Sequence, residues 1–178
     1  MLLFFLLCAC FAFGQQNPVD SLIQLLPAAK EDTNKVNLLF NITELCEEPD
    51  ILTYAEPALK LAEELDYKKG MANVLNNIAY VYDHKGNSIK ALELYQRSLA
   101  INLEINNTAG AANCYYFMGD IYQSQGNFKD ALDLYQKSLT IREQNKDRQG
   151  IARTLNQMAI IYSGLNNFKI ALEYFKKS

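Results

Sequence analysis

Identical residues recur along this chain at a fixed distance of 40 residues, at both small and aromatic positions. Repetition with a period of roughly 20 to 50 residues indicates an array of stacked structural units. The pattern therefore predicts a repeat protein, and the clearest unit begins at Gly70 and runs to Leu99. The residues that keep the spacing are Gly70, Gly110 and Gly150; Tyr82, Tyr122 and Tyr162; Ala91, Ala131 and Ala171; and Ser98, Ser138 and Ser178.

Each period contains two stretches whose apolar residues recur at helical spacing, which predicts a pair of helices. Glycine or asparagine follows the first helix of each pair, and both residues suit the left-handed conformation that ends a helix. Asn107 and Asp147 are suitable N-caps for first helices, whereas Tyr67 at the matching position is a poor one. The predicted first helices lie near 68–84, 108–124 and 148–164, the turns at 85–87, 125–127 and 165–167, and the second helices near 88–105, 128–145 and from 168 onward.

Small residues at matching positions predict where the two helices of a pair approach closely. Larger aromatic residues at other matching positions are expected to fill the remaining space. A single pair cannot bury its apolar face, so neighbouring pairs must stack. The small residues are Ala79, Gly119, Ala159, Ala91, Ala131 and Ala171, and the large ones are Tyr82, Tyr122, Tyr162, Tyr95, Tyr135 and Phe175.

Residues 32–66 predict a degenerate first repeat with the same two-helix plan. Asp32 is a suitable N-cap for its first helix. Pro49 is expected to end this helix, because the residue before a proline is pushed out of the helical region. The second helix contains Pro57, which removes one backbone hydrogen bond and predicts a kink.

The first residues of the chain differ in character from the rest. Residues 1–14 are uncharged and mostly apolar, but they fall short of the roughly 20 apolar residues that a membrane-spanning helix needs. They predict a secretory signal peptide cleaved after Gly14, although no basic residue follows the initiator methionine. A periplasmic or secreted protein follows from this reading; lipidation at Cys10 is the less favoured alternative. Residues 15–31 are expected to form a lead-in helix with Asn17 as its N-cap.

Composition narrows the classes of function. Hydrophobic residues make up 49% of the chain, the net charge is −3 and the pI is near 5.2, so this region offers no basic surface for nucleic acid. Cys46 and Cys114 fall in non-adjacent repeats and are expected to be buried thiols rather than a disulfide. His84 is the one histidine, and no metal-spaced cluster, phosphate loop or nucleophile motif is present. The sequence therefore predicts a protein that is not an enzyme and binds no metal or cofactor.

The residues that define the unit resemble the tetratricopeptide repeat family over about residues 32–178. Three features depart from the family pattern: Ser88 replaces the turn aromatic, Ser98 and Ser138 replace an alanine, and the period is 40 residues instead of about 34. The resemblance implies an all-α, right-handed superhelix of antiparallel helix pairs, with a degenerate repeat at 32–66, repeats at 67–106 and 107–146, and a truncated repeat at 147–178. The residues that carry the resemblance are Met118-Gly119, Tyr122, Gly126-Asn127-Phe128 and Ala131-Leu132-Asp133-Leu134-Tyr135-Gln136-Lys137-Ser138-Leu139.

The resemblance also implies a protein or peptide partner held along an inner wall of first helices. Asparagine side chains can bond to an extended peptide backbone, and aromatic residues supply contact area. Two plainer interpretations stay open: the asparagines are simply solvated, and Tyr116 packs between repeats with Phe117. A cationic clamp of the kind that grips chaperone C-termini is absent, since no lysine occupies the matching positions. The expected partner-binding residues are Asn73, Asn76, Asn77, Tyr80, Asn113, Tyr116, Asp120, Arg153 and Asn156.

Two functional hypotheses follow. The first is an exported, non-catalytic scaffold that binds a protein or peptide. The second is the N-terminal sensory part of a larger signalling protein, because such long repeats resemble those that precede a transmembrane helix and a kinase or DNA-binding domain in bacterial proteins. By its period, Ser178 matches Ser138 in the middle of a helix, so we expect a fragment, or self-association through the open C-terminal repeat. A membrane tether is expected only if the chain continues.

Overall fold

The regular structure of the chain is helical throughout the described residues. The computed structural model describes residues 18–47 and 50–178, and no strand occurs within these ranges. The helices are α1 (Pro18–Ile23), the short 3-10 helix η1 (Leu26–Ala28), α2 (Thr33–Leu45), α3 (Ile51–Glu64), α4 (Lys68–His84), α5 (Ser88–Glu104), α6 (Thr108–Ser124), α7 (Phe128–Gln144), α8 (Arg148–Gly164) and α9 (Phe168–Lys177).

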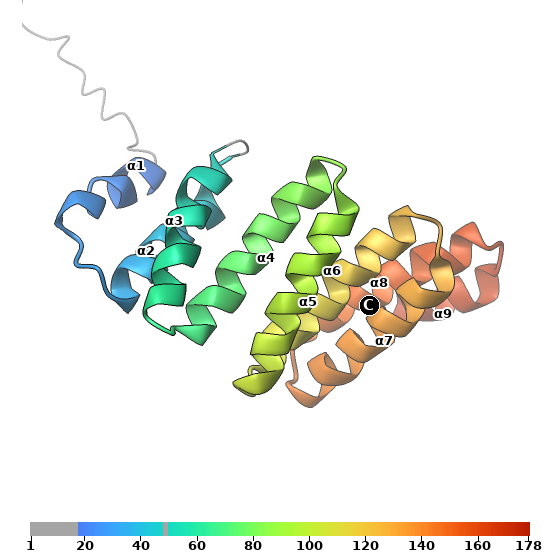
Figure 1. Ribbon diagram of the computed structural model, residues 1–178. Coiled ribbons are helices and arrows are strands. Elements are labelled where there is room, and N and C mark those ends of the chain that lie inside the picture. The colour runs from blue at the N-terminus through green and yellow to red at the C-terminus, as the bar shows by residue number, and fades with distance from the viewer. Residues whose placement is uncertain (1–17, 48–49) are drawn as a thin grey trace, which may run out of the picture.

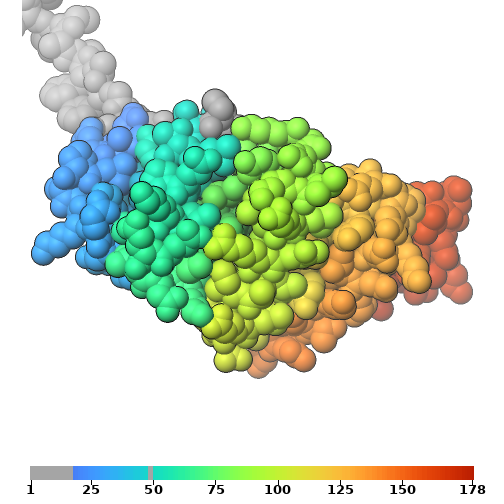
Figure 2. Space-filling model, viewed as in Figure 1, coloured from blue at the N-terminus to red at the C-terminus, as the bar shows by residue number. Residues whose placement is uncertain are grey.

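The helices pack as antiparallel pairs that stack in chain order (Figure 1). The pairs are α2 with α3, α4 with α5, α6 with α7, and α8 with α9, and the second helix of each pair also packs on the first helix of the next. Figure 2 shows them as one elongated body, with α2 toward one end and α9 toward the other. The expectation of an all-α solenoid of helix pairs is confirmed.

The predicted helix boundaries agree closely with the structure from α4 onward. The first helices α4, α6 and α8 have the expected bounds, and α5 and α7 end one residue earlier than expected. The last helix, α9, has 10 residues, compared with 17 in α5 and α7. The 40-residue period was therefore sufficient to place these elements.

The turns between helices repeat one backbone geometry. After α4 the amide of Asn87 donates to the Tyr82 carbonyl at 2.8 Å and that of Gly86 to the Asp83 carbonyl at 2.8 Å, while Gly86 has a φ of 77°. This arrangement is a Schellman motif, which satisfies the last carbonyls of a helix. The left-handed residue recurs at every junction from α3 to α9: Asp66, Gly86, Asn106, Gly126, Lys146 and Asn166. The sequence had predicted this conformation only for the turns within pairs.

From α5 onward, the residue after each turn caps the next helix. The Asp147 carboxylate accepts from the amide of Gly150 at 2.9 Å, and the Asn107 side chain accepts from Gly110 at 3.3 Å. Tyr67 makes no side-chain capping bond, as expected. Each junction thus closes one helix and opens the next without an intervening loop.

The N-terminal segments follow the expected plan less closely. The lead-in helix expected over 15–31 is only the six-residue α1 followed by η1. Asp32 caps α2 as predicted, accepting from the amides of Asn34 and Lys35 at 2.8 and 3.3 Å. Helix α2 ends at Leu45, and helix α3 continues through Pro57. The predictions that lie outside the described residues are the leader over 1–14, its cleavage after Gly14, lipidation at Cys10, the N-cap Asn17 and the helix stop at 48–49.

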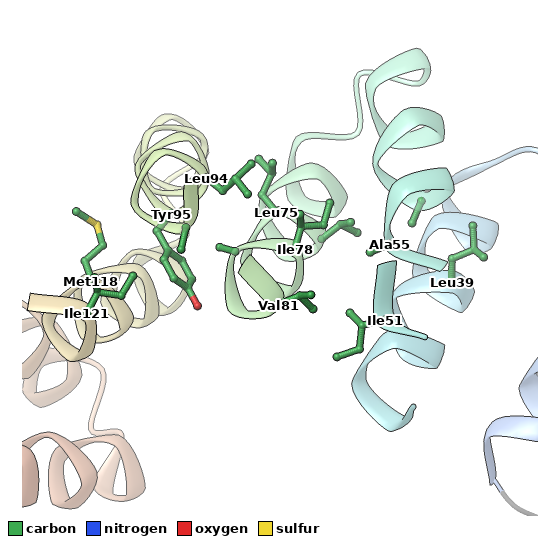
Figure 3. Packing of buried hydrophobic residues seen from close by; sticks show 14 residues of the cluster. Leu39, Ile51, Ala55, Leu75, Ile78, Val81, Leu94, Tyr95, Met118 and Ile121 are labelled. Atoms are coloured by element: carbon green, nitrogen blue, oxygen red, sulfur yellow. The ribbon is translucent and has the colours of Figure 1, made fainter. Parts of the chain in front are cut away.

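Large and small side chains interlock in the core, as Figure 3 shows for the first half of the array. Tyr95 and Tyr135 are buried, and a Cβ on Gly119 would lie 2.8 Å from the Tyr135 ring. The matching Phe175 on α9 is 43% exposed. Cys114 is buried and Cys46 half-buried, and both thiols are free, so only Cys114 is the fully buried thiol that was expected.

A buried polar cluster joins successive repeats. The Ser98 hydroxyl donates to the Ala72 carbonyl at 2.8 Å, and Asn102 donates to the Ser98 hydroxyl at 3.2 Å. Asn107, the N-cap of the next helix, donates to Asn102 Oδ1 at 2.7 Å. The cluster therefore connects α4, α5 and the start of α6. In the sequence, Ser98 was noted for its 40-residue spacing and as a departure from alanine; its hydroxyl is a structural contact.

The recurring glycines make room for this cluster. A Cβ on Gly110 would lie 2.2 Å from Asn102 Oδ1, and one on Gly150 would lie 1.8 Å from Arg142 Nη1. Such distances are far inside contact distance, so any side chain there would displace the buried partner. This crowding gives a physical reason for a glycine at each of these positions.

Candidate functional site

The first helices of the pairs form one side of the array. Helix α4 packs directly on both α2 and α6, whereas the second helices α3, α5 and α7 form no comparable contacts with one another. From α2 to α6 the stack is therefore tighter on the side of the first helices and more open on the side of the second. This difference makes the first-helix side the inner, concave one, where partner binding was expected.

Eight of the nine predicted residues are accessible on this side. They lie on α4, α6 and α8, and the structure places them on one side of the array. We call this surface the inner face. Its residues are the half-buried Asn73, Asn76, Asn77 and Asp120 and the exposed Tyr80, Asn113, Arg153 and Asn156.

Tyr116, the ninth predicted residue, is a packing residue instead. It is 5% exposed, and its ring centroid lies 5.6 Å from that of Tyr135 and 5.5 Å from that of Phe117. Its hydroxyl accepts from Gln157 Nε2 at 3.2 Å. Packing between repeats, the alternative interpretation from the sequence, therefore describes Tyr116. Helix α7 covers it with Tyr135, which the sequence alone did not reveal.

A cavity of about 580 Å³ opens near the N-terminal end of the inner face. It collects three predicted residues, Asn76, Asn77 and Tyr80, from α4. The remaining lining residues were not among the expected partner-binding residues, because most come from the irregular first repeat and Tyr95 had been assigned to packing. They are Thr43, Glu44, Cys46, Glu47, Ile51, Tyr95 and Phe117.

The two asparagines in this cavity have different hydrogen-bonding roles. Asn77 Nδ2 donates to Thr43 Oγ1 and Glu44 Oε1, both at 2.7 Å, and so ties α4 to α2. Asn76 accepts through Oδ1 from the Cys114 thiol at 3.4 Å, and its Nδ2 has no partner among the described residues. Asn77 therefore positions the cavity wall, and Asn76 offers it a free donor.

A second cavity of about 360 Å³ lies further along the same side, between α6 and α8. Asp120 lines it and accepts from the Tyr135 hydroxyl at 2.5 Å and from Gln157 Nε2 at 3.3 Å. Burial raises the pKa of Asp120 to about 6, against these two hydrogen bonds, which lower it. This carboxyl therefore titrates closer to neutrality than an ordinary aspartate.

Two tyrosines on second helices contribute hydroxyl groups that sequence reasoning missed. Tyr135 reaches Asp120, and Tyr95 lines the first cavity. Both had been assigned to packing alone. One signal was available: the family pattern accepts phenylalanine at this position, as at Phe175, whereas these two repeats carry tyrosine.

Neither a metal centre nor a membrane span occurs in the part of the chain that the structure describes. No group of three or more His, Cys, Asp or Glu side chains in 18–47 and 50–178 is arranged to hold a metal ion. No helix in those ranges is both long and apolar enough to cross a bilayer.

Comparison with protein families identifies the repeats. Two family models, both described as tetratricopeptide repeat, match residues 71–108 and 110–178. Together they span the regular helices from α4 to α9. The chain therefore belongs to the tetratricopeptide repeat family. No curated protein sequence matches it.

Solved structures share the fold at low sequence identity. The chain is similar to MamA, at 23% identity over 89% of this chain and 83% of that one, with a TM-score of 0.59. It resembles BtubC from P. vanneervenii at 19% identity, covering 89% and 67% of the two chains, with a TM-score of 0.69. The apo form of RapI gives 22% identity, 92% and 64% coverage, and a TM-score of 0.77. These likenesses establish the all-helical repeat fold.

Proposed function

We propose that this protein is a non-catalytic scaffold whose inner face binds an extended segment of another protein. The observation that carries the proposal is a set of polar side chains on the first helices α4 and α8 that have no side-chain hydrogen-bond partner among the described residues. Asn73, Tyr80 and Asn156 form no side-chain hydrogen bond within the described residues. Amide and hydroxyl groups held on packed helices can bond to the carbonyl and amide groups of an extended peptide.

The two cavities support the same conclusion. Both are lined by first-helix residues, and each mixes aromatic or aliphatic surface with a few polar groups. Peptide-binding surfaces combine such pockets, which select side chains, with polar groups that hold the backbone. An extended segment that follows the inner face would pass both cavities.

Substitution of the unpartnered residues tests the proposal. A library of displayed peptides is selected on the native protein, and the selected peptides are measured by fluorescence anisotropy. Loss of several polar and aromatic contacts should weaken binding about tenfold or more in the triple variant Asn73→Ala, Tyr80→Ala, Asn156→Ala. Its helicity by circular dichroism should not change, because none of these side chains forms a hydrogen bond to the rest of the fold.

A matched variant supplies the control. Gln96, Asp133 and Glu173 are exposed on the second helices α5, α7 and α9 and also lack side-chain partners among the described residues. Their replacement by alanine should leave peptide affinity unchanged. Equal affinity of both triple variants, or selection of no peptide at all, would overturn the proposal.

A sensory role within a larger signalling protein is the second candidate. The observation that favours it is an exposed apolar surface on and before α9, formed by Leu165, Phe168, Leu172 and Phe175. An exposed apolar surface of this kind is suited to be covered by another structural element or by a second copy of the chain. The intact mass of the native protein tests this candidate, and a species that corresponds to residues 15–178 alone would exclude it.

The proposal also includes export of the protein from the cytoplasm. The uncharged apolar run over 1–14 supports secretion with cleavage after Gly14, and Cys10 supplies the alternative of a lipid anchor. N-terminal sequencing of the protein from its native host should begin at Gln15. A blocked, lipid-bearing terminus at Cys10 would support the alternative, and an intact Met1 would rule out both.

A further inference from the structure

We propose that the first cavity of the inner face is the binding site for an arginine side chain of the bound segment. This inference rests on the proposed function and specifies its ligand. The cavity lies between the end of α2, the middle of α4, and the facing parts of α5 and α6. Aromatic rings, the carboxylates of Glu44 and Glu47, and a hydroxyl without a partner among the described residues meet there.

The hydroxyl of Tyr95 is the first indication of a ligand. The side chain is only 2% exposed, yet its hydroxyl has no hydrogen-bond partner among the described residues. All fully buried side-chain nitrogen and oxygen atoms in those residues do have partners, so this hydroxyl must open onto the cavity. Figure 3 shows it directed away from Leu94. A polar atom held inside an aromatic wall without a partner is suited to bond a ligand.

Comparison with the next repeat shows that this free hydroxyl is specific to the first cavity. Tyr135 occupies the position of Tyr95 one period later, and its hydroxyl bonds to Asp120 and lies 2.7 Å from Gln123 Oε1. In the earlier repeat Tyr80 stands in place of Asp120, so no carboxylate occupies that position. The Tyr135 hydroxyl therefore has partners within the protein, whereas the Tyr95 hydroxyl has none among the described residues.

The aromatic surface suits a planar cation. The Tyr95 and Phe117 rings stack with centroids 5.5 Å apart and planes 15° apart, and Tyr80 adds a third ring, packed against His84 at 3.9 Å. A guanidinium group binds to aromatic faces through both charge and planar stacking. A lysine ammonium carries the same charge but cannot stack, so arginine is the better fit.

The charges around the cavity favour a cation as well. Glu44 and Glu47 line it, and no lysine or arginine does so among the described residues. Burial raises the pKa of Tyr95, and the nearby negative charges of Asp83 and Asp120, which also favour a cation near its hydroxyl, raise it further. A guanidinium group can pair with carboxylates while one N–H donates to the Tyr95 hydroxyl oxygen. Asn76 Nδ2 remains free to donate to a carbonyl of the segment.

Nuclear magnetic resonance with a small probe tests the site on the full chain. The probe is N-acetyl-arginine N-methylamide, and its control is the citrulline compound, which has the same shape without the charge. We expect the arginine probe to shift the side-chain amide of Asn76 and the ring resonances of Phe117 at millimolar concentration. The citrulline probe should bind about tenfold more weakly, since it lacks the cation–π and carboxylate interactions.

Two conservative variants locate the interaction. Glu47→Gln removes a carboxylate that has no partner among the described residues, and Tyr95→Phe removes the unpartnered hydroxyl. Each variant should bind the arginine probe about threefold more weakly, or weaker still, at unchanged thermal stability. Equal binding of the arginine and citrulline probes, or the absence of shifts at the cavity, would overturn the inference. Peptides that shift only Asn113 and Asn156 would overturn it while leaving the proposed function intact.

Discussion

Asn102 and Arg142 occupy the same position in successive repeats and hold the same junction with different chemistry. Asn102 Nδ2 donates to the Ser98 hydroxyl at 3.2 Å, and Arg142 Nε donates to the Ser138 hydroxyl at 3.0 Å. Each also bonds to the N-cap of the next helix, Asn107 or Asp147, at 2.7 Å. The junctions of this array therefore share a geometry that accepts either a neutral or an ionic pair.

Arg142 should be a major contributor to stability at the junction of α6, α7 and α8. It is 5% exposed and bonds to Ser138, Asp147 and Asn113. Arg142→Ala should lower the free energy of unfolding by about 3 kcal/mol, because it leaves a cavity and removes three hydrogen bonds. Urea denaturation followed by circular dichroism measures the change, and loss of amide protection should begin in α8.

An exposed ion pair supplies the comparison for Arg142. Arg97 bonds to Glu63 at 2.6 Å, and both side chains are largely exposed. Arg97→Ala should lower the free energy of unfolding by about 0.5 kcal/mol or less.

The double variant Arg142→Asn, Asp147→Asn should be about 1 kcal/mol more stable than the sum of the two single changes, because the pair then matches Asn102 and Asn107. Strict additivity would contradict the equivalence of the two junctions.

Gly150 should not tolerate a side chain, although it lies in a helix. A Cβ there would lie 1.8 Å from Arg142 Nη1 and 2.0 Å from Asp147 Oδ2. Gly150→Ala should therefore destabilise the protein by about 2 kcal/mol or more. Gly164 is the last residue of the same helix, and a Cβ there would meet no atom of a neighbouring element within 4 Å, so Gly164→Ala should be neutral or stabilising by up to about 1 kcal/mol. Thermal denaturation of both variants measures the difference, and equal effects would show that crowding is not the cause.

Replacement of Lys146 by glycine should stabilise the protein. It adopts a φ of 57° at the junction between α7 and α8, a left-handed conformation that costs an L-residue roughly 1 kcal/mol. Gly126 has the same role at the preceding junction, between α6 and α7, with a φ of 76° and no neighbouring atom within 4 Å of an added Cβ. Lys146→Gly should raise the free energy of unfolding by up to about 1 kcal/mol, and Gly126→Ala should lower it by a similar amount. A change of the same sign in both variants would contradict this account.

Asp120 should make stability depend on pH. Its pKa is about 6 in the folded protein and 3.8 as an ordinary aspartate, so the native state binds the proton more tightly. The raised pKa stabilises the folded state fully below pH 3.8, and this stabilisation is lost as the pH rises through 6. At pH 8 the free energy of unfolding is therefore about 1 to 3 kcal/mol lower than it would be with Asp120 protonated.

Asp120→Asn tests this dependence. The amide oxygen can still accept from Tyr135 and Gln157, but it carries no charge. The variant should be more stable than the native protein at pH 8 and should lose the decline in stability between about pH 4 and 7 that Asp120 causes. The carboxyl ¹³C resonance of Asp120 should titrate near pH 6. Titration near pH 4 would contradict the assignment of a buried carboxyl.

The regular part of the fold could be predicted from sequence because its determinants are local. Caps, left-handed turn residues and small contact residues act within a few positions, and the period aligns them, which is why α4 to α8 begin where expected. The first repeat was harder to predict, because its residues keep the two-helix plan but not the 40-residue period. The lead-in helix was too long in prediction because a proline and an N-cap define a start but no end.

The site was only partly predictable because its details depend on side chains from other helices. Asn76 and Asn77 were equal candidates in the sequence, yet Thr43 and Glu44 of α2 occupy the Asn77 amide. Tyr116 shared a helical position with Asn76 but is covered by Tyr135 of α7. Such outcomes depend on which neighbour fills the space across the interface, and periodicity on one helix does not encode that.

The position of a bound peptide on the array tests the central claim most directly. Backbone ¹H–¹⁵N spectra recorded with and without a selected peptide assign each shift to one helix. We predict that the largest shifts fall on α4, α6 and α8, at or next to the eight inner-face residues, and that α5 and α7 change little. Shifts concentrated on the second helices, or on the exposed apolar surface at Phe168 and Leu172, would contradict the account.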